Sequence, residues 1–388
     1  MPRGIGPVNR RDDAAMPSRR LDAARRVWFV PIAMPDRPQP YIPQIGVSVV
    51  RPTPPGPVIR HDLSLNESSF GASPRAIAAA RARARRLERY PDPASRELRA
   101  AIGRAYGLDP ARIACGNGSE ELLDVIGRLF ARPGDEILFS RYGFVQFPIV
   151  AMRVGATAVA APERDLTADV AALLAAVTPR TRILYLANPN NPTATWLDRA
   201  ALTRLRDGLP GSVVLVIDAA YAEFVDDPLY DDGLALVGDR DNVVVTRTFS
   251  KAFGLAALRV GWIHGTAEMI ALVDRMRGIG NVNAIAQAAA VAALEDRGFV
   301  TDAVARTIES RARLTVGLRQ LGLEVPESGT NFLLPRFADA GAAQAQLRAA
   351  GILVRRVDDY GLPDRLRIGV GTAEEVDAVL ASLRPLLE

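Results

Sequence analysis

The sequence of 388 residues is poor in cysteine and histidine, and both shortages exclude kinds of chemistry. Cys115 is the only cysteine, so no disulfide can form within the chain, which fits a reducing cytoplasm. Cys115 follows Ile113 and Ala114, and this apolar stretch favours burial over a catalytic thiol. His61 and His264 are too few and too far apart for a histidine-rich metal site or a nucleophilic triad. We therefore expect that any catalysis by this protein uses neither a histidine-bound metal nor a catalytic histidine.

Lysine is almost absent. Of the 48 basic residues 47 are arginines, and Lys251 is the only lysine. Arginine serves wherever a general cation is needed, but it cannot replace an amine that must lose its proton and form a Schiff base. The alternative is the chance survival of one surface lysine, which the hydroxyl-rich residues around Lys251 argue against.

Long apolar runs are missing as well. No run approaches the ~20 residues that a membrane helix needs, and no signal peptide is recognisable near the N-terminus. The first 60 residues hold ten arginines against four aspartates, but they lack regular aromatic spacing or a recognisable nucleic-acid module. We therefore expect a cytoplasmic protein with neither a membrane nor a nucleic acid as partner.

The N-terminal part differs in composition from the rest of the chain. Proline is dense from Pro31 to Pro57, which is typical of an extended arm. We expect residues 1–40 to be a basic, proline-rich extension, or to result from a start placed too early, with Met16 and Met34 as alternatives. Residues 41–72 are expected to form an N-terminal arm.

From Ser73 onward the pattern alternates between helices and strands. Ser73 and Pro74 predict a helix start, with the helix reaching about Arg89. A second helix is predicted at 95–106. Short apolar runs predict buried strands at 136–140, 182–187, 213–217 and 243–246, with amphipathic helices at 167–177 and 198–209 between them. This pattern predicts an α/β fold with a parallel sheet covered on both faces, in a large domain of residues 73–278.

The last third predicts a smaller α+β domain of residues 279–388. A long helix is expected at 300–319, followed by strands at 331–337, 352–357 and 366–370 with helices between and after them.

Two segments are candidates for ligand contacts through backbone and amide groups. Gly116-Asn117-Gly118-Ser119-Glu120-Glu121 follows a predicted strand and opens a helix, whose free N–H groups suit an anion. An ordinary strand–turn–helix connection explains this segment equally well. Residues 188–193 (Asn-Pro-Asn-Asn-Pro-Thr) follow the strand predicted at 182–187, at its carboxyl end, where α/β sheets place ligands.

Two further segments carry ionisable groups. Asp218 ends an apolar strand, where a carboxylate is costly without a cation; a protonated pyridine nitrogen would supply one, although a turn-capping role is the alternative. Thr248-Phe249-Ser250-Lys251, with Arg259 eight residues after the lysine, places hydroxyls and a guanidinium beside an amine. This set suits an aldehyde cofactor that carries a phosphate.

In this order the four segments resemble the fold-type-I aminotransferases, which depend on pyridoxal 5'-phosphate, and within them the histidinol-phosphate aminotransferases. The resemblance runs from about Asn66 to the C-terminus and is most specific around Lys251. It implies a mainly parallel seven-stranded sheet between helices, with a smaller α+β C-terminal domain.

The resemblance also implies the cofactor contacts. Lys251 would hold the cofactor and move the substrate proton, Asp218 would pair with the ring nitrogen, and Tyr221 with Asn191 would bind the ring oxygen. The ring would stack on Tyr142. The phosphate contacts would come from Gly118, Ser119, Glu120, Thr248, Ser250 and Arg259. Tyr90 resembles the tyrosine that reaches the cofactor of a neighbouring subunit, which implies a homodimer with shared active sites.

Four residues are implied in substrate binding. Arg367 corresponds to the arginine for an α-carboxylate, Arg355 to the one for a distal phosphate, and Asn66 lines the entrance, with Asn191 nearby. Either arginine could equally be a solvated surface charge. The implied substrates are an amino acid, glutamate in particular, with histidinol phosphate and imidazole acetol phosphate or a related aromatic compound.

Two departures from the family pattern concern the substrate. Ala219 and Ala194 stand where the family usually has glutamate and glycine, and neither substitution removes an implied cofactor contact. One alternative keeps the cofactor and changes the reaction, as a decarboxylase of a phosphorylated amino acid. Another is a non-catalytic regulator that binds the cofactor, but such a regulator needs a DNA-binding module and the proline-rich N-terminal part shows no helix-turn-helix pattern.

Overall fold

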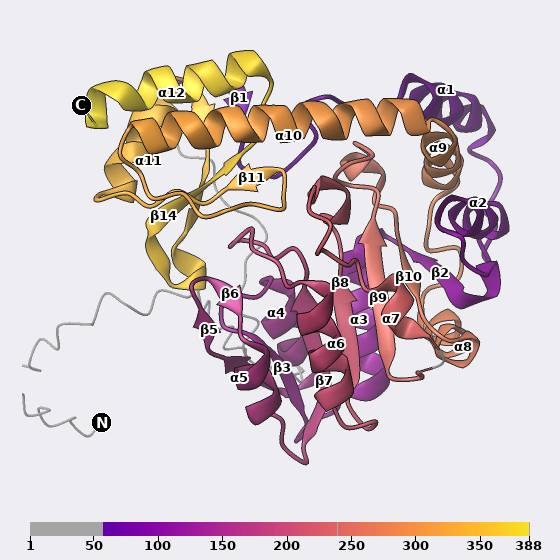
Figure 1. Ribbon diagram of the computed structural model, residues 1–388. Coiled ribbons are helices and arrows are strands. Elements are labelled where there is room, and N and C mark those ends of the chain that lie inside the picture. Colours follow the sequence, from indigo (N-terminus) through magenta and orange to yellow (C-terminus); the bar gives the residue numbers. More distant parts are fainter. Residues whose placement is uncertain (1–56, 239, 388) are drawn as a thin grey trace, which may run out of the picture.

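A central seven-stranded sheet organises the fold in a computed structural model that describes residues 57–238 and 240–387 (Figure 1). The extension expected at 1–40, the two alternative starts and the first half of the arm (41–56) lie outside the described residues. The strand order is β2-β10-β9-β8-β7-β3-β4. The strands are β2 (Ile113–Gly116), β3 (Glu136–Ser140), β4 (Thr157–Ala161), β7 (Thr181–Ala187), β8 (Val214–Asp218), β9 (Val243–Thr248) and β10 (Gly261–His264). Only β10 runs antiparallel to its neighbours, so the sheet is mainly parallel, as predicted.

Both faces of this sheet are covered by helices, which explains why its strands are continuous apolar runs rather than alternating ones. Within β7, Ile183 and Tyr185 pack toward α3 (Gly118–Phe130), α4 (Gln146–Val154) and α8 (Ala267–Met276). The alternate residues Leu184 and Leu186 pack toward α5 (Val170–Ala175), α6 (Arg199–Gly208) and α7 (Leu234–Val237).

A further layer of helices lies beyond β2 and β10. It contains α1 (Pro74–Arg83), α2 (Arg96–Tyr106) and α9 (Ala284–Glu295), and α9 packs against both of the others. Ala286, Ala289 and Ala290 share one buried cluster with Trp262 of β10. The domain bounds expected from the sequence stay a prediction, although α9, which follows the expected boundary, packs with residues that precede it.

The long helix α10 (Arg297–Gln320) runs from this layer to a smaller C-terminal unit (Figure 1). Here β11 (Phe332–Leu333), β14 (Leu362–Gly369) and β13 (Arg355–Val357) form a three-stranded antiparallel sheet, and β12 (Ile352–Leu353) pairs with β1 (His61–Asp62). Helix α11 (Ala340–Ala349) packs on β12 and β14, and α12 (Ala373–Leu387) packs against α10 and α11. Leu63 lies in the same core as Leu314 and Leu366, so the arm before α1 belongs to this unit by packing.

The remaining elements are short. They are the strands β5 (Glu163–Arg164) and β6 (Thr167–Ala168), and 3-10 turns at Ala84–Arg86, Pro110–Arg112, Ala222–Phe224, Ala256–Leu258 and Asp358–Tyr360.

Several expected elements differ from those observed. The strand expected at 352–357 is divided into β12 and β13, which belong to different sheets, and the one expected at 366–370 begins at Leu362. The first helix ends at Arg83 and continues only as a 3-10 turn. The helix expected at 167–177 is the short α5, because Asp169 accepts hydrogen bonds from the N–H groups of Ala171 and Ala172 and so caps the helix there. The strand expected at 331–337 is interrupted after β11, because Pro335 has no N–H to continue the ladder, and its pairing with β14 resumes where Arg336 lies opposite Arg365.

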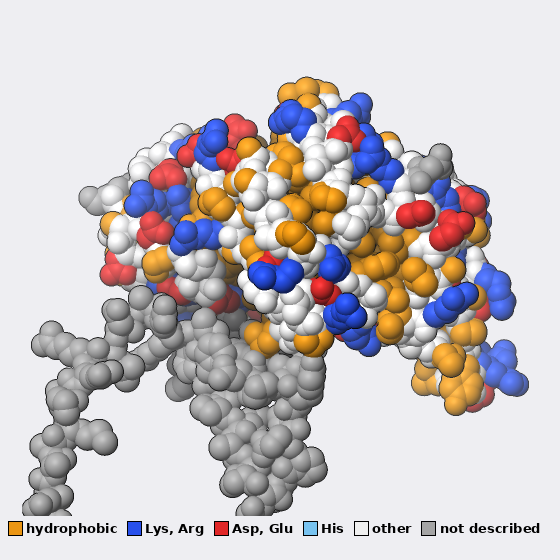
Figure 2. All heavy atoms as spheres, turned by 90° about the horizontal axis from the view of Figure 1, so that it is seen from below, with side chains coloured by type: hydrophobic (Ala, Val, Ile, Leu, Met, Phe, Trp, Pro, Cys, Tyr) orange, Lys and Arg blue, Asp and Glu red, His pale blue; other side chains and the backbone are white. Residues whose placement is uncertain are grey.

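The face seen in Figure 2 carries arginine and acidic side chains interspersed with apolar ones, rather than a stripe of one charge. Within the described ranges, none of the helices has both the length and the hydropathy to cross a membrane.

Candidate active site

The candidate site lies at the edge of the large sheet where its parallel strands end, which is where α/β sheets place ligands. The register sets Asp218 of β8 beside Thr246 of β9. At the same edge, Gly261 of β10 lies opposite both Thr248 of β9 and Gly116 of β2. The segments that the sequence singled out are therefore neighbours in space.

Lys251 lies in the turn after β9 and is partly buried. Its Nζ donates hydrogen bonds to the backbone oxygens of Asn66 at 3.1 Å and Leu65 at 3.4 Å, and lies 5.7 Å from the centroid of the Tyr221 ring. Burial, helped by the positive charge of Arg367, lowers the pKa of this amine to about 8. Near neutral pH a usable fraction of the amine is thus in the neutral form that attacks a carbonyl carbon.

Asp218 is the last residue of β8 and only 4% exposed. Its Oδ1 accepts a hydrogen bond of 2.9 Å from the hydroxyl of Thr246, and no cation of the described residues forms an ion pair with it. Burial raises the pKa of this carboxyl to about 7. A buried carboxylate without a cation is costly, so the position suits a ligand that brings a positive charge.

Tyr221 and two asparagines form a buried group beside the lysine. Asn66, at φ +56°, donates from Nδ2 to the hydroxyl oxygen of Tyr221 at 3.1 Å. Asn331 donates from Nδ2 to the backbone oxygens of Asn66 at 3.1 Å and Glu67 at 3.2 Å. Burial raises the pKa of Tyr221 to about 12, so its hydroxyl keeps its proton. The Oδ1 atoms of both asparagines are buried without a partner in the described part of the chain, which leaves them available to a donor.

The glycine-rich turn between β2 and α3 faces a guanidinium. Gly118 has φ +78°, and a Cβ built there would lie 2.8 Å from Nη2 of Arg259. Arg259 donates from Nη1 to the hydroxyl of Ser250 at 3.2 Å and pairs with the carboxylate of Glu120 at 3.4 Å. The hydroxyl of Thr248 accepts from the backbone N–H of Ser250 at 3.1 Å. A helix N-terminus, two hydroxyls and an arginine thus surround one small space, a set of groups that fits a phosphate.

Arg367 of β14 points to the same region and is only 5% exposed. It donates from Nη1 to Oδ1 of Asn191 at 2.7 Å and from Nη2 to the backbone oxygen of Ser64 at 2.6 Å, and it lies 5.3 Å from the Phe332 ring. Burial lowers the pKa of its guanidinium.

Arg355 of β13 is the cross-strand partner of Arg367. Like charges in such positions repel, and here Asp359 offsets one of them through an ion pair of 2.6 Å with Arg355. Two guanidinium groups of opposed residues, one of them fully buried, can accept a substrate with an anionic group at each end.

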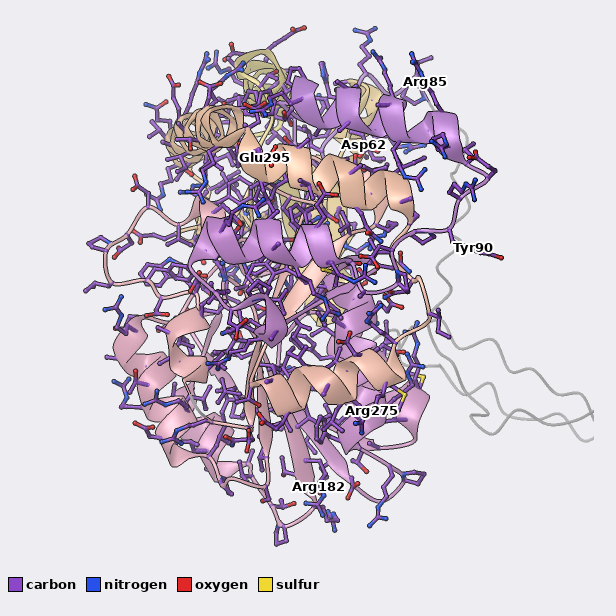
Figure 3. The ribbon with its side chains drawn as sticks, turned by 90° about the vertical axis from the view of Figure 1, so that its right-hand side faces the viewer. Asp62, Arg85, Tyr90, Arg182, Arg275 and Glu295 are labelled. Carbon is purple, nitrogen blue, oxygen red and sulfur yellow. The ribbon has the colours of Figure 1, made fainter. Side chains whose placement is uncertain are left out.

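The two remaining tyrosines differ in location. Tyr142 borders the site after β3: its backbone N–H donates to Glu163 at 3.0 Å and its carbonyl accepts from Asn190 at 2.9 Å. Tyr90 is 97% exposed and points away from the molecule (Figure 3), so it contacts no part of the site within its own chain.

Comparison with known families agrees with this geometry. The model of the aminotransferase class I and II family matches residues 59–383. The chain belongs to this family.

Among relatives, histidinol-phosphate aminotransferase of Rhodospirillum centenum is 51% identical over 83% of this chain and 90% of its own length. The enzyme of the same name from Rhodopseudomonas palustris is 47% identical over 89% of this chain and 98% of its own length. Among solved structures, histidinol-phosphate aminotransferase of Sinorhizobium meliloti in complex with pyridoxal-5'-phosphate is similar with a TM-score of 0.80. It is 31% identical and covers 85% of this chain and 91% of its own. Family and fold therefore agree with the expectation from the sequence.

Within this aminotransferase chain, the structure adds site residues that the sequence reasoning missed. Asn331 fixes the backbone at Asn66, and Tyr360, whose pKa is raised by burial, accepts a hydrogen bond from the N–H of Val145 at 3.2 Å. An asparagine at the start of the apolar run Phe332-Leu333-Leu334 was a usable signal for the first. Nothing in the sequence around Tyr360 distinguishes it from a core aromatic residue.

Proposed function

We propose that the chain is a pyridoxal-phosphate-dependent aminotransferase that moves an amino group between glutamate and the pair histidinol phosphate and imidazole acetol phosphate, in histidine biosynthesis. The observation that carries this proposal is the environment of Lys251, the only amine-bearing side chain. Its pKa is lowered to about 8, and the buried carboxylate of Asp218 and the glycine-rich turn that faces Arg259 lie at the same sheet edge. The names of the relatives at 51% and 47% identity support the substrate.

The residues of the site fit this cofactor group by group. Asp218 would pair with the ring nitrogen, since its buried carboxylate lacks a cation of its own. Gly118, Ser119 and Glu120 at the start of α3, with Thr248, Ser250 and Arg259, would hold the phosphate. Tyr221 and Asn191 would donate to the ring oxygen, and Tyr142 would cover the ring. When bound, the cofactor supplies an electron sink that stabilises negative charge on the substrate carbon.

The chain's own part in the reaction is proton transfer and orientation. Lys251 takes the proton from the substrate carbon and returns it, which requires an amine that is neutral for part of the time near pH 8. Tyr221 and Asn66 keep the amine's surroundings fixed through their hydrogen bond. Arg367 would grip the α-carboxylate of glutamate, and Arg355 the distal anion of either substrate, because a guanidinium fork suits carboxylate and phosphate alike.

The homodimer and the cytoplasmic location are part of the proposal. Tyr90 is 97% exposed on a segment that points outward (Figure 3), where it could reach the cofactor phosphate of a second copy. Leu87 and Ile279, also strongly exposed and apolar, suit burial in the same interface.

A half-reaction screen of the purified holoenzyme tests the proposal. The absorbance of the cofactor is followed after adding glutamate, an aromatic amino acid, histidinol phosphate or a phosphorylated amino acid, and the products are identified. Conversion to the amine form of the cofactor by glutamate and by histidinol phosphate is expected. Release of carbon dioxide from a phosphorylated amino acid would instead assign a decarboxylase, and no spectral change with any amine would refute catalysis.

A further inference from the structure

The glycine-rich turn at the start of α3 is braced by Glu121, a residue outside the proposed phosphate contacts. Its Oε2 accepts a hydrogen bond of 2.5 Å from the backbone N–H of Asn117 and one of 2.7 Å from Nδ2 of Asn281. The same carboxylate oxygen lies so close to Gly116 that a Cβ there would be 3.2 Å from it. Glu121 therefore fixes the residues directly before Gly118.

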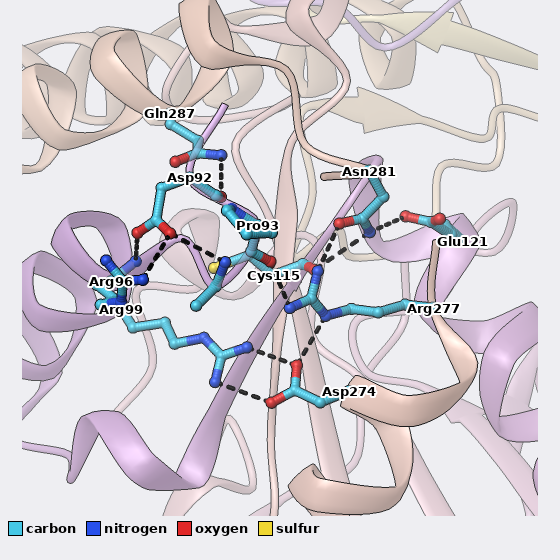
Figure 4. A network of polar contacts seen from close by, with 11 residues as sticks. Asp92, Pro93, Arg96, Arg99, Cys115, Glu121, Asp274, Arg277, Asn281 and Gln287 are labelled. Atoms are coloured by element: carbon cyan, nitrogen blue, oxygen red, sulfur yellow. Dashed lines mark hydrogen bonds and ion pairs between the residues drawn. The ribbon is translucent and has the colours of Figure 1, made fainter. Parts of the chain in front are cut away.

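Asn281 connects this brace to the neighbouring helices (Figure 4). Its Oδ1 accepts from Nη1 of Arg277 at 2.8 Å, and its Nδ2 also approaches the backbone oxygen of Cys115 at 3.4 Å. Arg277, whose side chain is only 6% exposed, donates from Nε to Asp274 at 2.7 Å. Asp274 is in turn paired with Arg99 of α2 at 2.6 Å.

The network also reaches the segment that carries Tyr90. Arg277 donates from Nη2 to the backbone oxygen of Pro93 at 2.8 Å, and Gln287 of α9 donates to the backbone oxygen of Asp92 at 3.0 Å. Residues of α2, α3, α8 and α9 and of the loops that precede α2 and α9 are thus joined to the turn through partly buried side chains. Hydrogen bonds to charged groups are stronger than neutral ones, and the carboxylates of Glu121 and Asp274 stand at two of the junctions.

We propose that Glu121 is a positioning residue, which, held by Asn281 and Arg277, sets the glycine-rich turn in the geometry that binds the cofactor's phosphate. The inference rests on the proposed function only in naming the phosphate of pyridoxal phosphate as the ligand of this turn.

The charge of Glu121 makes the proposal testable, because a repulsive role and a positioning role predict opposite changes in phosphate affinity when Glu121 is removed. A carboxylate one residue beyond Glu120 repels a phosphate, so if charge alone mattered, removing it would tighten phosphate binding. If Glu121 positions the turn, removing its acceptor oxygen weakens phosphate binding in spite of the lost repulsion. Glutamine separates the two cases, because it keeps an oxygen that accepts both hydrogen bonds but carries no charge.

The experiment compares the binding of pyridoxal phosphate and of pyridoxal to the cofactor-free full-length protein. Both aldehydes react with Lys251, but only the first engages the phosphate turn. For Glu121→Ala we expect an affinity for pyridoxal phosphate lower by about tenfold, the effect of losing one charged hydrogen bond, with pyridoxal changed less than about threefold. Glu121→Gln should bind both within about threefold of the original protein.

Two further variants complete the design. Asp124→Ala removes a carboxylate from the same helix without touching the turn, since Asp124 pairs with Arg128 and Arg153, and should leave the ratio of the two affinities unchanged. Asn281→Ala should lower the affinity for pyridoxal phosphate relative to that for pyridoxal. In the double variant this effect should not add to that of Glu121→Ala, because the two residues act through one contact.

Three results would overturn the proposal. Tighter binding of pyridoxal phosphate by Glu121→Ala would make Glu121 a source of repulsion only. Equal losses for both aldehydes would indicate general damage to the site, and unchanged affinities for both would leave the turn independent of the brace. Failure of the original protein to form an adduct at Lys251 with either aldehyde would instead refute the proposed function.

Discussion

Asp218→Asn should have opposite effects on the stability of the cofactor-free protein and on the function of the holoenzyme. The substitution removes a buried negative charge but keeps an oxygen that accepts the hydrogen bond of 2.9 Å from Thr246. In the cofactor-free protein the charge has no ion-pair partner among the described residues, whereas in the proposed holoenzyme it faces the ring nitrogen of the cofactor.

The magnitude follows from the pKa of Asp218, which rises from 3.8 to about 7 because the carboxyl is buried. One pKa unit is worth about 1.4 kcal/mol, so the ionised form is disfavoured in the folded protein by about 4 kcal/mol. Because the folded protein keeps a proton that the unfolded chain releases, stability falls as the pH rises from about 4 to about 7. The amide of asparagine offsets part of the gain, since its N–H groups are buried without a partner at a cost of about 1–3 kcal/mol. Above pH 7 the cofactor-free variant should therefore be more stable than the original by about 1–3 kcal/mol, and at pH 5 it should not be.

Urea unfolding of both cofactor-free proteins between pH 5 and pH 8 measures this difference. In the holoenzyme the catalytic rate, rather than the stability, is compared, and here the original protein should exceed the variant. A cation at ~4 Å from the carboxylate is worth roughly 4 kcal/mol at an effective dielectric of about 20, and its loss should slow proton removal by a factor on the order of 10³. A variant that is less stable by the same amount at every pH would refute the reasoning about the buried charge. A variant that turns over within a few-fold of the original would show that Asp218 has a structural role only.

Three other substitutions test separate parts of the site. Lys251→Ala should abolish turnover and the labelling of residue 251 by borohydride reduction. In the original protein the rate of adduct formation should rise with pH around a pKa of about 8, because only the neutral amine reacts, and a flat pH profile would contradict this. Arg355→Ala should weaken histidinol phosphate and glutamate together by roughly 2–4 kcal/mol in kcat/KM and leave an aromatic amino acid without a distal charge nearly unchanged, whereas equal losses for all three would indicate general damage. Gly118→Ala places a Cβ 2.8 Å from Arg259 at φ +78°, so the affinity for the cofactor should fall about tenfold or more in a titration followed by absorbance, and unaltered affinity would show that this space is not used.

Much of the large sheet could be predicted from the sequence because its strands are buried on both faces. Continuous apolar runs ending in polar residues, such as Val214–Asp218, indicate both a parallel strand and the edge where a ligand binds. The predicted ends of these strands are within two residues of those observed. Lys251 could be identified for a different reason, because it is the only lysine in a chain of 47 arginines and therefore the only side-chain amine.

The contacts of the C-terminal unit with the site could not be predicted in the same way. Arg367 reaches Asn191 and the backbone of Ser64, residues that lie 176 and 303 positions earlier in the chain, and no local pattern encodes such a separation. The short strand β11 is an example: its pairing with β14 is interrupted at Pro335 and resumes at Arg336, which pairs with Arg365. Asn331, directly before β11, bonds to the distant Asn66. The proposed substrate-binding residues therefore depend on how the arm at 61–66 packs between two units. The arm also contacts Lys251 and Tyr221, but Asp218 and the proposed phosphate contacts lie at the edge of the large sheet. This difference leads us to expect that substitutions in the core shared by Leu63 and Leu366 will change the KM for substrates more than the affinity for the cofactor.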